Sequence, residues 1–359
     1  MRPRDRVLTA LHHEEPDRIP IDLGSTQVTS IATRAYANLR AALGLPDAEV
    51  QVAEPIQQLA VVEEEVLRAL EVDTRGLGPN PPSGYRMQIF EEGDYLAYYD
   101  EWGSKLRKPK EAGNYFDWVE FPIKESTLEA LEKYRWPDPD DPARYAGLRE
   151  KAKALYEGTD YALVGTAPLG SDILAMPQRT HGYPESMMDL VAEPEFAEAF
   201  LEKLTQMALK AWSHFLDEVG DYIQVAALFE DLGTQTGPLI SPAIYRRLVK
   251  PREARIVELI KSKTKAKVFL HCCGAIREFI PDFIEIGIDI LNPIQVAARG
   301  LEDTASLKKE FGKHISFWGA ACDSQRVFSW ATPEQVREET RRRIRDRSEE
   351  RRVGKECLS

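Results

Sequence analysis

The sequence has no long apolar run, and no stretch approaches the roughly 18 to 20 consecutive apolar residues that a membrane span requires. Its charged start, Met1 to Arg6, leads into an amphipathic segment and not into the apolar core of a secretory signal. Both absences argue against an integral membrane protein and against export. We therefore expect a cytoplasmic protein without a membrane partner.

Basic residues are outnumbered, because the chain has 47 Lys and Arg against 59 Asp and Glu, a formal net charge of −12. Binding to a polyphosphate needs a basic surface, so this balance argues against a nucleic-acid partner. Hydrophobic residues make up 43% and charged residues 30% of the chain, which is typical of a globular protein. A small-molecule substrate is the expectation that remains.

Cysteine is scarce, with four in 359 residues, and their positions indicate no disulfide framework. In a reducing compartment, adjacent thiols such as Cys272 and Cys273 indicate metal binding or catalysis. Cys357 lies in the segment 347–359, which corresponds to the translation of a common sequencing adapter. We interpret this segment as an adapter-derived tail and leave it out of the fold prediction; the alternative is a natural charged helix end.

Short apolar runs alternate with amphipathic helical patterns along most of the chain. The apolar runs lie at 19–23, 161–166, 222–229, 267–270, 288–291 and 314–318. The helical patterns lie at 28–43, 57–71, 196–219, 242–262, 276–286, 304–311 and 333–344. This alternation is typical of βα units around a parallel sheet. Since no Gly-x-Gly-x-x-Gly turn follows a run, we predict a (β/α)8 TIM barrel and not an open dinucleotide-binding sheet.

The barrel is expected to form one domain, residues 1–346, with an insertion at 76–122. Within the insertion, apolar segments at 87–90 and 95–99 flank Glu91-Glu-Gly-Asp94, a pattern that predicts a β-hairpin. Six strands are clear and one or two before residue 143 are blurred, whereas a closed barrel needs eight. We therefore expect the chain to be truncated before its last strand.

Candidate site residues gather where the predicted strands end, which is the active-site face of a parallel barrel. Two carboxylates, Asp231 and Asp323, are the candidate catalytic residues. The candidate substrate-binding residues are Asp22, Glu230, Asn292 and Gln295. Each of these side chains could instead cap the following helix, an alternative that stays open above all for Asp22 and Asn292. Their recurrence on successive strands favours a site.

The segment His271-Cys272-Cys273 is the sharpest local signal. Side chains alternate along a strand, so His271 and Cys273 face one side, roughly 6.6 Å apart along the backbone, and Cys272 faces the other. An imidazole and a thiolate in this arrangement can bind one Zn²⁺. Cys322 or Glu230 could add a third ligand. The alternative is a buried histidine beside small hydrophobic cysteines.

Five segments together resemble the uroporphyrinogen decarboxylase superfamily. They are 16–24, 230–238, 268–275, 288–295 and 318–325, and the resemblance extends over about 1–346. It implies a (β/α)8 barrel. The Arg-Gln-Ala-Gly-Arg-Tyr signature of the decarboxylases themselves is absent, because Ile-Asp-Leu-Gly-Ser-Thr-Gln follows Pro20.

This departure places the chain nearer to the corrinoid-dependent methyltransferases of the superfamily. The resemblance then implies a Zn²⁺ site that includes His271 and Cys273, a corrinoid as methyl donor, a thiol as acceptor and a corrinoid protein as partner. Glu230 or Asp231 could complete the coordination or orient the substrate. The first alternative is the conversion of uroporphyrinogen III to coproporphyrinogen III, which needs no cofactor. The second is a protein that binds a corrinoid or another metabolite without turnover.

Overall fold

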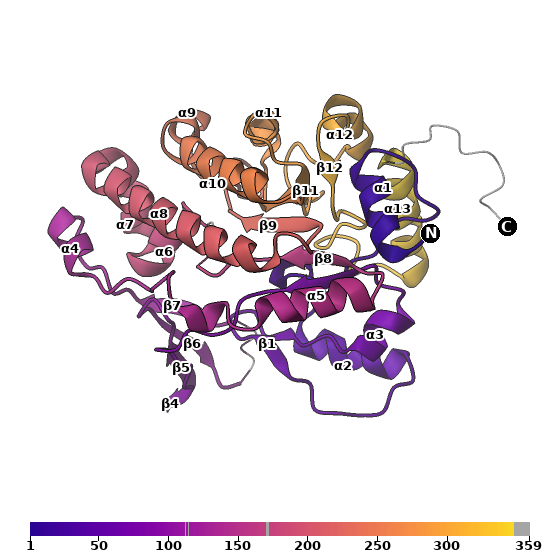
Figure 1. Cartoon of the computed structure of the whole chain (residues 1–359), viewed down its shortest axis with the longest axis horizontal. Coiled ribbons are helices and arrows are strands. Elements are labelled where there is room, and N and C mark those ends of the chain that lie inside the picture. Colours follow the sequence, from indigo (N-terminus) through magenta and orange to yellow (C-terminus); the bar gives the residue numbers. More distant parts are fainter. Residues whose placement is uncertain (112, 114, 170–171, 348–359) are drawn as a thin grey trace.

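A computed structural model describes residues 1–111, 113, 115–169 and 172–347 (Figure 1). Apart from Arg347, the expected adapter-derived tail with Cys357 lies outside the described residues. Among the helices that the structure describes, none combines the length and the apolar character that crossing a bilayer requires. The fold is mixed α/β, as the alternation in the sequence predicts.

Six parallel strands form the central sheet, in the order β12-β11-β10-β9-β8-β3. Their bounds are β3 (Thr74–Leu77), β8 (Ala162–Gly165), β9 (Val225–Phe229), β10 (Lys267–His271), β11 (Ile290–Asn292) and β12 (Ser316–Phe317). The five expected strands between 161 and 318 are confirmed. The order of the six strands in the sheet follows their order along the chain, as in a βα barrel, with β4 to β7 inserted between β3 and β8.

The first expected strand, 19–23, is wrong as secondary structure, but its segment lies beside the sheet edge. Ile21 O accepts a hydrogen bond from Asp73 N at 2.8 Å, just before β3. At the other edge, Trp318 Nε1 donates to Asp22 Oδ2 at 3.1 Å, just after β12. The segment therefore bridges the two edge strands. The arrangement is barrel-like, although closure by eight strands is not confirmed.

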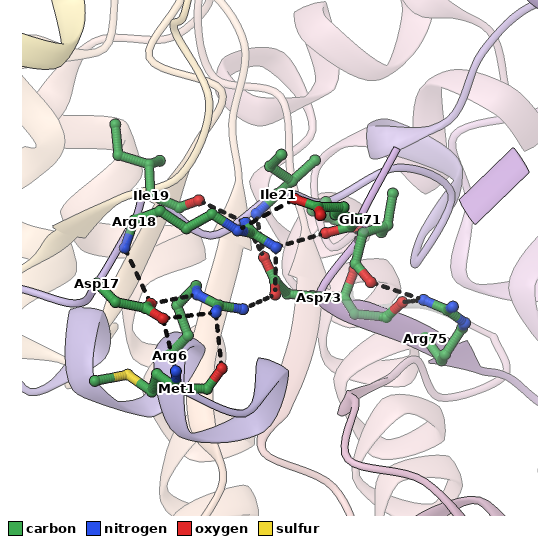
Figure 2. Close-up of polar contacts among 12 residues, drawn as sticks. Met1, Arg6, Asp17, Arg18, Ile19, Ile21, Glu71, Asp73 and Arg75 are labelled. Atoms are coloured by element: carbon green, nitrogen blue, oxygen red, sulfur yellow. Dashed lines mark hydrogen bonds and ion pairs between the residues drawn. The ribbon is translucent and has the colours of Figure 1, made fainter. Parts of the chain in front are cut away.

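An ion-pair network around one buried aspartate fixes this bridging segment, as Figure 2 shows. Its centre is Asp73, whose side chain has no exposed surface. Arg6 Nη1, from helix α1 (Pro3–Leu11), donates to Asp73 at 2.6 Å, and Arg18 Nη1 donates to it at 2.8 Å. Ile21 N donates to the same carboxylate at 2.8 Å, so one aspartate orders the chain up to Asp22.

Helices cover the sheet and bury the main core between the two layers. The long helices α8 (Pro194–Val219) and α10 (Lys250–Lys263) run side by side (Figure 1). The other helices are α2 (Thr33–Ala42), α3 (Glu64–Ala69), α4 (Leu128–Lys133), η2 (Pro142–Arg144), α5 (Leu148–Gly158), α6 (Ala175–Thr180), α7 (Tyr183–Ala192), α9 (Pro242–Ile244), η3 (Tyr245–Val249), η4 (Arg277–Phe279), α11 (Ile280–Glu285), α12 (Thr304–Phe311) and α13 (Pro333–Arg347).

Two expected helices near the N-terminus are shorter than their patterns. The expected helix 28–43 is divided into η1 (Gln27–Thr29) and α2. Of the expected helix 57–71, only α3 is helical, because β2 (Leu59–Ala60) pairs with β1 (Val52–Glu54). Gln58 adopts a positive φ of 56°, which a helix interior does not allow.

The expected hairpin is confirmed and belongs to a larger unit. Strands β4 (Phe90–Glu92) and β5 (Tyr95–Tyr99) pair around a turn, and β6 (Lys105–Pro109) and β7 (Asp117–Glu120) complete a four-stranded antiparallel sheet. Ser104 Oγ donates to Arg179 O at 2.8 Å, which joins this sheet to the end of α6. Since α6 follows β8, the insertion stands on the side where the parallel strands end.

Candidate metal centre

Three side chains from adjacent strand ends bring possible metal ligands together. Asp231 follows β9, His271 is the last residue of β10, and Cys273 lies two residues further on. One donor atom of each lies within 4.8 Å of the other two. Among the described residues this is the one such group of three histidine, cysteine or acidic side chains. Its nitrogen, sulfur and oxygen donors are all ligands that zinc accepts.

The distances fit one tetrahedral ion. His271 Nε2 lies 3.3 Å from Cys273 Sγ and 3.9 Å from Asp231 Oδ1. Ligands bound to zinc at ordinary lengths in a tetrahedron are about 3.5 Å apart. The side chain of Asp231 is 49% exposed, whereas that of His271 is 13% exposed. Three ligands with one side open to solvent are typical of a catalytic zinc site, which keeps a fourth position for substrate.

Backbone and amide groups hold these ligands in place. Cys273 N donates to Asp231 Oδ1 at 3.0 Å, which ties the two strand ends together. Asn292, the last residue of β11, places Oδ1 2.6 Å from His271 Nδ1. Gln295 Oε1 accepts a hydrogen bond from Gly274 N at 3.0 Å. Both predicted amide residues therefore lie directly beside the ligands.

The surroundings of the group are acidic. Burial raises the pKa of the Cys273 thiol to about 12, and the nearby Asp231 carboxylate adds to this shift. Burial also raises the pKa of Asp172, and the nearby Asp231 carboxylate adds to this shift. Arg179 Nη1 lies 3.2 Å from Asp172 Oδ2 and opposes that rise. A cation at this place would offset the repulsion among the carboxylates and displace the thiol proton.

The structure does not bring every predicted site residue to this group. Glu230 is buried and accepts hydrogen bonds from Leu174 N at 2.7 Å and Ala175 N at 3.2 Å, so its carboxylate faces the start of α6. Burial raises its pKa well above the usual range. Cys322 is not one of the grouped ligands, and Asp323 accepts hydrogen bonds from Gln325 N and Arg326 N, as a capping residue does.

Asp22 lies deeper in the fold, between the two edge strands. Thr74 Oγ1 donates to Asp22 Oδ1 at 2.6 Å, and Trp318 Nε1 holds the other oxygen. Burial raises the pKa of Asp22, although these hydrogen bonds oppose the shift. Cys272 packs with the sheet-to-helix core, away from the ligand group, as strand alternation predicts.

Sequence reasoning missed Asp172 and Arg179 as neighbours of the site. Neither follows a predicted strand directly, because Asp172 comes seven positions after the last residue of β8, Gly165, and Arg179 lies inside α6. The sequence named Asp231 as a candidate catalytic residue and, with Glu230, as a residue that could complete the metal coordination; the structure groups Asp231 and not Glu230 with His271 and Cys273. The signal for placing Asp231 in this group was its position just after strand β9, which pairs with strand β10.

The chain matches the family described as uroporphyrinogen decarboxylase (URO-D) over residues 99–353, well over half of its length. A solved structure with a similar fold is the methyltransferase from Methanosarcina mazei, with a TM-score of 0.54 and 16% sequence identity. The alignment covers 88% of this chain and 82% of that one. At this identity the likeness shows the fold alone. Comparison with curated protein sequences gives no match.

Proposed function

The chain belongs to the uroporphyrinogen decarboxylase family, and we propose that it is a zinc-assisted methyltransferase of that family. In this proposal Asp231, His271 and Cys273 hold the metal, a thiol is the methyl acceptor, and a corrinoid, carried by a partner corrinoid protein, is the donor. The observation that carries the proposal is the convergence of these three donor atoms within 4.8 Å. The solved structure with a similar fold is also that of a methyltransferase, which supports the proposal.

In this proposal, different residues of the chain would activate the acceptor thiol and bind the substrate. A bound zinc lowers the pKa of a thiol that coordinates it, so the acceptor is presented as a thiolate. Asp231, the most exposed of the three ligands, marks the side from which the substrate enters. Arg179 keeps 33% of its side chain exposed beside Asp172 and can pair with a negative group on the substrate. Asp22 and Gln295 remain the candidate contacts for the rest of the substrate.

Metal analysis tests the proposal. The purified protein should hold about one zinc per chain, and a double variant His271→Ala and Cys273→Ala should hold none, because three ligands fall to one. With methylcobalamin and a simple thiol, the wild-type protein should produce the methyl thioether and the double variant should not. Active protein that contains no metal would refute the proposal.

Decarboxylation of uroporphyrinogen is the second candidate function, because the family to which the chain belongs is described as uroporphyrinogen decarboxylase. Decarboxylation of uroporphyrinogen would not depend on the metal ligands, so His271→Ala should leave it intact. A direct assay for coproporphyrinogen separates the two functions. Binding of methylcobalamin with neither reaction would instead indicate a protein that binds a corrinoid without turnover.

A further inference from the structure

One amide connects the metal ligand His271 to the end of strand β12. Asn292 is 3% exposed and makes two polar contacts with its side chain. Its Oδ1 lies 2.6 Å from His271 Nδ1, and its Nδ2 donates to Trp318 O at 2.8 Å. His271, Asn292 and Trp318 lie at the ends of the neighbouring parallel strands β10, β11 and β12. The amide of Asn292 therefore connects the ends of the two outer strands.

The contact with Trp318 O decides which way the amide faces. A backbone carbonyl can only accept a hydrogen bond, so the NH2 group of Asn292 must face it. The reverse orientation would place two acceptor oxygens against each other. Oδ1 therefore faces His271, and since an amide oxygen is also only an acceptor, His271 Nδ1 must carry a proton. A neutral imidazole has one N–H, which leaves the lone pair on Nε2.

The backbone around Trp318 allows this carbonyl little freedom. Trp318 N donates to Leu291 O at 2.9 Å, and its ring packs edge-to-face on Phe269 at 5.7 Å. Gly319 follows with a φ of +111°, and a Cβ there would come 2.8 Å from Pro293 O and 3.3 Å from Asn292 Nδ2. The close approach of Gly319 to the amide requires glycine at this position.

The free lone pair points to the ligand group, because Nε2 is the His271 atom near Cys273 Sγ and Asp231 Oδ1. We propose that Asn292 is a positioning residue that holds His271 in the Nδ1–H tautomer, and that Trp318 O sets this choice from beyond the next strand. Asn292 then acts on the metal through His271 and not as a substrate ligand. The effect on metal affinity rests on the function proposed above, whereas the tautomer does not.

Nitrogen NMR of metal-free protein tests the tautomer directly. Long-range proton–nitrogen correlations at pH 8.5, where an ordinary imidazole is neutral, distinguish the two tautomers of each of the six histidines. The His271 signals are assigned from a His271→Gln variant. Wild-type His271 should show the Nδ1–H pattern. In Asn292→Leu, which is similar in shape but has no acceptor, that pattern should change to Nε2–H or to a mixture.

Zinc affinity, measured by competition with a chromophoric chelator, gives the second result. Asn292→Leu should bind Zn²⁺ about 10- to 100-fold more weakly, as is usual when a partner of a ligating histidine is removed. Trp318→Phe is the matched control, because it removes the indole but keeps the carbonyl. It should leave the His271 tautomer unchanged. Asn292→Asp, which keeps an acceptor toward Nδ1, should retain the Nδ1–H pattern even if it is less stable.

The outcomes separate this inference from the proposed function. Wild-type protein that binds no zinc contradicts the proposed function. An Nε2–H pattern in wild-type protein overturns the inference, and so does a zinc affinity in Asn292→Leu equal to that of the wild type. A tautomer change in Trp318→Phe as large as that in Asn292→Leu also overturns it, because the effect would then come from packing and not from the carbonyl.

Discussion

Asp231 differs from the other two proposed ligands because its charge can be removed without disturbing the backbone. In Asp231→Asn, the amide oxygen can still accept the hydrogen bond from Cys273 N. The negative charge that a divalent cation needs is lost, so we expect at least a tenfold lower zinc affinity with little change in folding. Isothermal titration with Zn²⁺ measures it.

The control for this variant lies at the other end of strand β9. Asp221 is exposed and precedes the strand, so Asp221→Asn removes the same charge from the chain without touching the ligand group. Its zinc affinity should equal that of the wild type. If both variants lose affinity alike, the net charge of the molecule and not ligation by Asp231 explains the effect.

Glu253 should make stability depend on pH. It lies in α10 at 5% exposure, Tyr245 OH donates to its Oε2 at 2.6 Å, and burial raises its pKa to about 7 from 4.5. The folded state thus keeps the proton to a higher pH than the unfolded state does. The free energy of unfolding therefore falls by about 3 kcal/mol as the pH rises from about 4.5 to about 7.

The variant Glu253→Gln cannot ionise, so this pH dependence should disappear. Relative to wild type, its free energy of unfolding should rise between pH 4.5 and pH 8, as measured by urea denaturation at several pH values. Glu258→Gln, on the exposed side of the same helix, should show no such trend. Parallel pH curves for wild type and Glu253→Gln would contradict the assignment.

At the scale of elements, the bridging segment depends on one carboxylate. Asp73→Asn would place an amide NH2 among the donors of Arg6, Arg18 and Ile21. The variant removes a buried carboxylate from its ion pairs with Arg6, which keeps Asp17, and with the partly exposed Arg18. We expect a loss of about 3 kcal/mol, which urea denaturation can measure. Asp5→Asn is the control, because its ion pair with Arg2 is exposed on α1 and should contribute less than about 1 kcal/mol. Equal losses in both variants would show that Asp73 is not the centre of the network.

Strands were predicted correctly where an apolar run alone determined them. Strand β9 is a continuous apolar run and strand β10 has the apolar centre Val268-Phe-Leu270, and both were found. The segment 19–23 was not a strand, because side chains such as Asp73 and Trp318 and only scattered backbone bonds hold it in place. The pattern at 57–71 failed because Leu59 and Val66 have helical spacing but belong to different elements.

The candidate site was predictable to the extent that strand alternation determines it. His271 and Cys273 share a face because they are two residues apart on one strand, and that spacing is visible in the sequence. The pairing of Asp231 with them depends on the register between β9 and β10, in which Phe229 lies opposite His271. No local pattern encodes this register, so the third ligand could not be chosen from the sequence.

At the scale of the whole molecule, the proposed ligand group would couple metal binding to folding of the sheet. Its members come from β9 and β10, and the amide that orients His271 comes from β11. An unfolded chain would not hold these groups together, so zinc should bind the folded state preferentially. Binding should then stabilise the whole fold and not only the strand ends.

The size of this stabilisation follows from mass action. At a free zinc concentration 100 times the dissociation constant, the free energy of unfolding should rise by about 2.7 kcal/mol, and a chelator should reverse the gain. Thermal unfolding with and without Zn²⁺ measures it. His271→Ala, which keeps the sheet but loses a ligand, should show little or no zinc-dependent shift. A zinc-dependent shift in His271→Ala equal to that of wild type would place the zinc elsewhere, because loss of His271 should weaken binding at this group.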